Sequence, residues 1–272
     1  MNSPLHTFAR SLARASGGAV IFSLPILMTM EMWWLGFHMD RLKLVLLILV
    51  MVPLLTGLSF HSGFEETFNW KEDLSDGLIA YAIGFLIGTL ILALFGVITT
   101  GMSPSEIVGK ISIQAIPGSI GAILAQSQLK AKSPEEERRE EQGGYGAEIF
   151  HMLAGAIFLA LNVAPTDEMV LIAYQMSPWH GIALLLLSLL VMHAFVYAVE
   201  FHGQAAIPEG GTHPGVFLKF TVVGYALCLL VSAYMLWTFG RTEGMPITQI
   251  VMTTVVLGFP AAIGAAAARL IL

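Results

Sequence analysis

Long apolar runs constrain this chain more than any other feature of its sequence. A helix that spans a bilayer needs roughly 20 mostly apolar residues. Only 12% of the 272 residues are charged, and the mean hydropathy is +0.76, whereas about a quarter of an ordinary soluble domain is charged. The sequence therefore predicts an all-α, polytopic transmembrane helical bundle with about eight spans, at residues 17–38, 43–62, 77–98, 105–127, 147–175, 181–201, 216–239 and 247–271.

Charge and cysteine usage exclude several classes of function. The formal net charge of −6 argues against nucleic acid as a partner. The single cysteine, Cys228, excludes an intramolecular disulfide and a cysteine metal cluster. The sequence contains no convincing nucleophile–base arrangement and no phosphate-binding glycine loop, so we expect no enzyme activity and no cofactor. The expected partners are the lipid bilayer and a small ion, and a homo-oligomer is left open.

The two halves of the chain resemble each other, which predicts an internal duplication. "TMEM" at 29–32 matches "TDEM" at 166–169, "FH" at 60–61 matches "FH" at 201–202, and "IPGSIGA" at 116–122 matches "FPAAIGA" at 259–265. Four spans per copy is an even number, so the copies should be parallel repeats about a pseudo-twofold axis along the membrane normal. We predict an N-terminal segment over 1–16, repeats over 17–128 and 145–272, and a charged linker over 129–144.

Lysine and arginine set the predicted orientation, because positive charge favours the cytoplasmic side. The side that holds both termini and the linker carries Arg10, Arg14, Lys71, Lys130, Lys132, Arg138, Arg139, Lys219 and Arg269. The other side carries Arg41, Lys43 and Arg241, with Lys110 near the start of a span. We therefore predict that both termini and the linker are cytoplasmic.

Glu31 is the most unexpected residue in the apolar runs. On a straight helix from Gly17 it would lie about 21 Å into the membrane, where a carboxylate is costly unless it is protonated, paired or exposed to water. Glu168 holds the matching position in the second copy. The candidate ion- or proton-binding residues are therefore Glu31, Thr29, Glu168, Asp167 and Thr166, and the metal, if any, is unknown.

Prolines near these carboxylates predict locally unwound helix. Pro25 lies four residues before Thr29, and Pro165 immediately precedes Thr166. A proline removes one helical hydrogen bond and frees a carbonyl for a ligand or water, and broken helices build ion sites in transporters. Pro117 and Pro260 lie in the small-residue stretches, which favour close helix packing and allow a kink.

Two alternatives compete with a functional role for the carboxylates. They could form a structural pair with Lys110 or with an indole N–H. The fifth span could instead end near Val163, which would leave "APTDEM" in a solvated outer loop. Other candidates are weaker. Lys110 could serve as a counter-ion or extend to the membrane edge. His61 and His202 lie at predicted span ends, where a histidine is either solvated or senses protons.

The stretches "FSLPILMTMEMWWLGF" at 22–37, "FGVITTGM" at 95–102 and "IPGSIGAILAQSQL" at 116–129 resemble a family of bacterial integral membrane proteins with no assigned function. The resemblance covers nearly the whole chain. It implies a polytopic protein of the bacterial inner membrane, and it carries over no activity, substrate or site residue.

From the residues, the leading hypothesis is a proton or cation channel or transporter that uses the intramembrane carboxylates, either at one shared site or at two separate ones. The alternative is a membrane sensor or scaffold in which the carboxylates are structural and the acidic linker 129–144 docks a partner. An intramembrane enzyme is the third hypothesis, and the missing nucleophile speaks against it.

Overall fold

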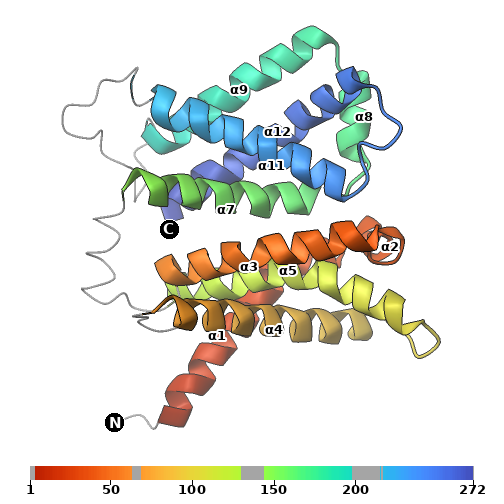
Figure 1. Cartoon of the computed structure of the whole chain (residues 1–272), viewed down its shortest axis with the longest axis vertical. Helices are drawn as coiled ribbons and strands as arrows, with labels where there is room; N and C mark the ends of the chain where they lie inside the picture. Colours follow the sequence, from red (N-terminus) through yellow and green to blue (C-terminus); the bar gives the residue numbers. More distant parts are fainter. Residues whose placement is uncertain (1–3, 63–68, 130–143, 198–214, 216, 272) are drawn as a thin grey trace. The chain divides into compact units, whose positions relative to one another are not determined.

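The computed structural model describes residues 4–62, 69–129, 144–197, 215 and 217–271. Every regular element in these ranges is a helix (Figure 1), which confirms the predicted fold class. Seven helices are long and apolar enough to span a membrane, or up to eight spans if a bent helix pair is included. The chain divides into two compact units, Met1–Gln142 and Gly143–Leu272, and each is described by itself.

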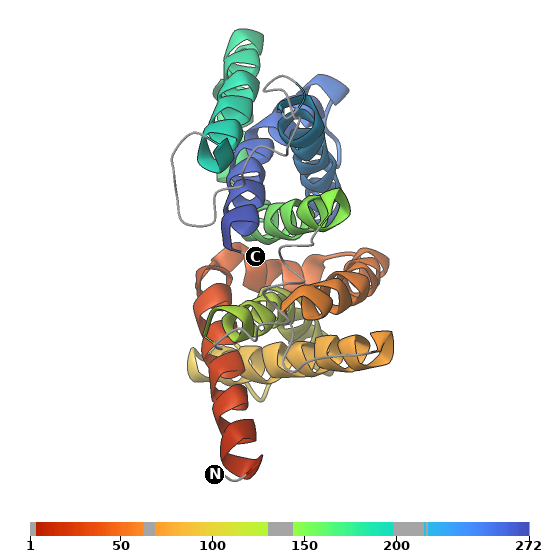
Figure 2. The same ribbon diagram turned by 90° about the vertical axis from the view of Figure 1, so that its left-hand side faces the viewer.

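In the first unit, one helix forms the centre and the others pack around it. The helices are α1 (Pro4–Leu27), α2 (Met30–His38), α3 (Arg41–Ser62), α4 (Trp70–Leu94) and α5 (Pro104–Leu129). The central helix is α5, which packs against the other four, and Figure 2 shows it beside α4. Of the most apolar 18-residue stretch of α5, 83% is buried, whereas the corresponding shares are 39% for α3 and 33% for α4. The predicted span with the weakest hydropathy is therefore the core of the unit.

Glycines explain how closely the helices approach α5. A Cβ atom on Gly84 of α4 would lie 2.5 Å from the Ala115 carbonyl oxygen, and one on Gly18 of α1 would overlap the backbone of Gly121. The helix α5 continues through Pro117. The small-residue stretch around this proline therefore serves close packing, as its composition favours.

The second unit has its own central helix. Its elements are α7 (Tyr145–Val163), α8 (Glu168–Gln175), α9 (Pro178–Tyr197), the π-helix η1 (Phe217–Val222), α11 (Val223–Thr238) and α12 (Ile247–Ile271). The central helix α12 packs against α7, α8, α9 and α11. It approaches α7 through Gly264 and Gly155 and continues through Pro260.

Matching turns end the fourth helix of each unit. Gly96 follows α4 with a φ of 70°, and Gly240 follows α11 with a φ of 72°. Glycine suits this left-handed conformation because it has no Cβ. The turn after α11 brings the N–H of Arg241 within 2.8 Å of the Leu236 carbonyl oxygen. This hydrogen bond therefore fixes the position of the Arg241 backbone directly after α11.

Two of the predicted spans are broken. The span expected over 17–38 is divided between α1 and α2, which bend by 86° at the break. The helix α1 already begins at Pro4, inside the predicted N-terminal segment, and the span expected over 147–175 is divided between α7 and α8. The depth of Glu31 calculated for a straight helix is therefore wrong, because this residue lies on α2, beyond the bend.

Candidate functional site at the helix breaks

The break in the first unit begins three residues after Pro25. Residue Thr29 has extended backbone, with φ −97° and ψ 115°, between the end of α1 and the start of α2. A helix end leaves its last carbonyls without helical partners. Three of these carbonyls are satisfied here: the Thr29 hydroxyl donates to Pro25 O at 2.5 Å, the Trp33 indole donates to Leu27 O at 2.8 Å, and Ile26 O accepts from Gln114 Nε2 at 3.3 Å.

These hydrogen bonds reduce the number of free oxygen ligands that the break could provide to an ion. The hydroxyl and the carbonyls were predicted to be free oxygen ligands. They are instead engaged with one another and with the side chains of Trp33 and Gln114. The break is therefore a defined, internally bonded turn, and the carboxylate that follows it is the group left to meet an ion.

Contacts with α5 place the break along the bundle. Gln114, which reaches Ile26 O, lies ten residues after Pro104, or about 15 Å along the helix. The apolar span of α5 is Pro104–Ala125, so the break lies level with its middle. The surroundings are apolar, because Leu27 packs in a buried cluster with Leu92 and Ile111.

Glu31 lies in the first turn of α2 and is half-buried. Among the residues that the structure describes, none donates a hydrogen bond to its carboxylate or forms an ion pair with it. Within the described residues Glu31 does not form either of the pairings considered for it, because Lys110 pairs with Glu106 at 2.8 Å and the Trp33 indole donates to Leu27 O. Glu31 is thus available to a proton or an ion from outside the described residues.

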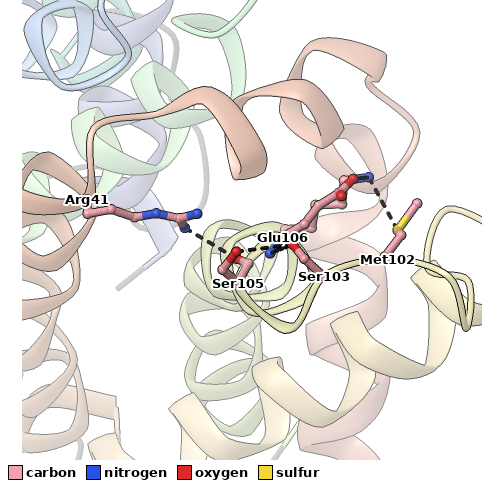
Figure 3. A network of polar contacts seen from close by, with 6 residues as sticks. Arg41, Met102, Ser103, Ser105 and Glu106 are labelled. Atoms are coloured by element: carbon pink, nitrogen blue, oxygen red, sulfur yellow. Dashed lines mark hydrogen bonds and ion pairs between the residues drawn. The ribbon is translucent and has the colours of Figure 1, made fainter.

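Lys110 pairs with Glu106, which belongs to the polar network that Figure 3 shows at the start of α5. Its side chain is 10% exposed, pairs with Glu106 one turn before it and lies 3.8 Å from Met102 Sδ. The Glu106 N–H lies 3.3 Å from Ser103 Oγ, and Arg41 donates to Ser105 O at the same distance. The network therefore anchors the start of α3 to the start of α5 and neutralises the lysine without Glu31.

A close backbone contact sets the far end of α2. A Cβ on Gly36 would overlap the backbone of Lys110, and one on Gly109 would overlap Gly36 O. In Figure 1, α2 lies at the end of the unit where α5, coloured yellow, begins. Glu31 is therefore positioned between the break and this glycine contact.

The break in the second unit has a different chemistry. Thr166 donates its hydroxyl to Val163 O at 2.9 Å, and Arg241 pairs with Asp167 at 2.5 Å and donates to the Pro165 carbonyl. Asp167 and Glu168 are both exposed. The helix α7 ends at Val163, as the loop alternative expected for this copy. The two carboxylates Glu31 and Glu168 are therefore in unequal surroundings.

We expect Arg241→Met to destabilise the second unit by about 1–3 kcal/mol, the cost of leaving a carbonyl without its charged donor. The Asp167 pair itself contributes little, because the Asp167 side chain is 76% exposed. Thermal unfolding of the purified protein measures the loss. Arg41→Met serves for comparison, since that arginine makes one hydrogen bond of 3.3 Å to a carbonyl in the first unit, and an unchanged stability of Arg241→Met would contradict the assignment.

Several predicted residues lie outside this description. His61 is in the last turn of α3, but its side chain is not among the described ones, and His202 and linker residues 130–143 lie outside the described ranges. Their predicted roles stay predictions.

Sequence reasoning missed two residues that hold the breaks, Gln114 and Arg241. A signal for the first was present. At the offset of 143 that aligns Pro117 with Pro260, Gln114 falls on Leu257, so one half carries an amide where the other carries an apolar side chain. No sequence signal distinguished Arg241 from an ordinary loop arginine.

The donor set limits what Glu31 can bind. The described residues contain no group of three or more His, Cys, Asp or Glu side chains close enough to hold a metal ion. Hard cations such as Ca²⁺ take six to eight oxygen ligands, whereas a proton needs one carboxylate.

The chain was compared with protein-family models, curated proteins and solved structures. Residues 11–272 match a family model described as "Putative integral membrane protein (DUF2391)". This match confirms the resemblance found in the sequence, and the description assigns no activity. Neither the curated proteins nor the solved structures compared with the chain gave a match.

Proposed function

The chain belongs to the DUF2391 family of integral membrane proteins, and from that premise we propose that it moves protons across the membrane, as a channel or in a coupled transporter, through Glu31. The observation that carries the proposal is a half-buried carboxylate beside an 86° helix break, with no partner among the described residues. An ionisable residue in a spanning bundle is costly and typically marks an ion or proton path.

The surroundings of Glu31 favour a proton over a metal cation. Dehydrating a cation requires several oxygen ligands to replace its water. The oxygen candidates in the adjoining break, the Thr29 hydroxyl and the carbonyls of Pro25, Ile26 and Leu27, already take part in hydrogen bonds. A carboxyl group binds and releases a proton without such a cage.

Purified protein in liposomes tests the function. With a pH gradient imposed across the membrane and valinomycin present to balance charge, we expect the protein to dissipate the gradient faster than protein-free vesicles do. Dissipation at the rate of empty vesicles would contradict a proton channel, and a coupled transporter would then have to show proton movement on addition of a substrate. In a second assay without valinomycin, protein-dependent flux of Na⁺ or K⁺ without proton movement would replace the proton by a cation.

The second unit has a carboxylate of its own at the matching helix break. We propose that Arg241 stabilises the break between α7 and α8 by binding the Pro165 carbonyl. We also propose that Glu168, which is exposed, serves a site separate from that of Glu31, because the two carboxylates have unlike surroundings. A shared site for Glu31 and Glu168 remains the competing prediction.

We further propose a bacterial inner-membrane location with both termini in the cytoplasm, on the distribution of lysine and arginine. The duplication with a pseudo-twofold axis is part of the same proposal, and the shared order of helices in the two units supports it. The sensor or scaffold alternative depends on linker 129–144, almost all of which lies outside the described residues.

A further inference from the structure

Gln114 carries a polar atom that the fold leaves without a partner. The residue is 1% exposed, in the middle of the central helix α5. Its Nε2 donates to Ile26 O at 3.3 Å, while its Oε1 is buried and accepts no hydrogen bond from any described residue. Exchanging the amide atoms would set Oε1 against the carbonyl oxygen, so the hydrogen bond fixes their assignment.

A buried amide oxygen needs a hydrogen-bond donor, above all inside a membrane. The side chain lies between two helices, α1 at Ile26 and α4 at Gly88, where a Cβ would lie 3.5 Å from Gln114 Cβ. Glycine at this position therefore lets α4 pack directly against Gln114. A water molecule is the donor that fits an apolar bundle, because it is small and uncharged.

The same amide is linked to the turn that carries Glu31. Ile26 O accepts from Gln114 Nε2 at 3.3 Å and from the Thr29 N–H at 3.0 Å, and Thr29 lies two residues before Glu31. Gln114 and the first turn of α2 thus share one carbonyl oxygen. Proton relays in membrane proteins use ionisable side chains that face the bundle interior or a water-filled cavity.

We propose that Gln114 Oε1 binds a water molecule between α1, α4 and α5, and that this water continues the proton path from Glu31 into the bundle. The proposal rests on the proposed proton movement through Glu31. The water accepts a proton on its oxygen from the Glu31 carboxyl, directly or through a further water, and releases one of its own protons onward. The amide holds the water by accepting one of its O–H groups and is unchanged at the end.

An experimental structure at a resolution that shows waters tests the binding part. We expect density within about 3 Å of Gln114 Oε1, the distance of an O–H···O or N–H···O bond. Protein atoms donating to Oε1 in its place, or a dry site, would overturn the proposal whatever the flux.

The variant Gln114→Leu tests the path. Leucine occupies the aligned position of α12, where Leu257 is fully buried, so the fold is expected to accept it. We expect proton flux to fall about tenfold, the effect of losing one hydrogen-bonded step. The matched control is Ser119→Ala, because this buried hydroxyl on the same helix donates within its own turn, to Ile116 O at 2.7 Å, and its loss should leave the flux unchanged.

The outcomes separate this inference from the proposed function. Wild-type flux in Gln114→Leu together with lost flux in Glu31→Gln would overturn the water path and leave Glu31 as the proton site. Absence of proton movement in the wild-type protein would instead overturn the proposed function, while the bound water would still be decided by the structure.

Discussion

Replacing Glu31 by glutamine should lower proton flux in liposomes by about a hundredfold, the lower range of what a positioned proton-transfer group contributes. Glutamine keeps the shape of the side chain but cannot bind and release a proton. The carboxylate has no partner among the described residues, so the change should alter the free energy of unfolding by no more than about 0.5 kcal/mol. Flux and thermal unfolding are measured on the same preparation.

Asp40→Asn is the matched control for this change. Asp40 is exposed, and its Oδ1 accepts from the Leu42 and Lys43 N–H groups at 2.8 and 3.1 Å, which an asparagine oxygen also does. The control removes the same charge from the same region without touching the break. Equal flux in Glu31→Gln and wild-type protein, or an equal loss in both variants, would contradict the role of Glu31.

Gly18→Ala should be among the most destabilising single-methyl changes in the chain. The added Cβ would overlap the Gly121 carbonyl and the Ala125 side chain, where α1 crosses the central helix α5. Overpacking of this kind costs about 1–3 kcal/mol, and a backbone atom cannot give way as a flexible side chain can. Thermal unfolding in detergent should therefore show a clearly lowered midpoint.

The neighbouring glycine supplies the control for packing. A Cβ on Gly17 meets no atom within 4 Å, and alanine favours a helix over glycine by up to about 1 kcal/mol. Gly17→Ala should therefore leave stability unchanged or raise it. A similar midpoint for both variants would show that α1 and α5 do not meet through Gly18.

The membrane class and the place of the first helix break could be read from the sequence. Apolar length and low charge predict spanning helices, and Pro25 predicts unwound backbone a few residues later, where α1 ends at Leu27. The close packing around Pro117 follows from small residues on one face. Each of these features depends on residues close together in the sequence, so sequence patterns are enough to predict them.

The direction of the chain after the break could not be predicted. A proline predicts a break in the helix, but the 86° bend depends on tertiary contacts. One is the close approach of the Gly36 backbone to Gly109 and Lys110, and the other is the hydrogen bond from Gln114 to Ile26 O. The depth of Glu31 depended on that direction.

The partner of Lys110 was also open from the sequence. From the sequence, Lys110 was considered only as a partner of the intramembrane carboxylates or as a side chain that extends to the membrane edge, and Glu106 was not considered. The i,i+4 spacing decided for Glu106, because residues four apart lie on the same helix face. Glu31 was left without that partner, which no reading of separate motifs anticipated.

The most direct test of the central claim is the reversal potential of the protein in a planar bilayer with opposed pH and K⁺ gradients. If Glu31 carries protons, the current should reverse near the proton equilibrium potential in the wild-type protein and should be lost in Glu31→Gln. A current that reverses near the K⁺ potential, or a proton current that persists in Glu31→Gln, would contradict it.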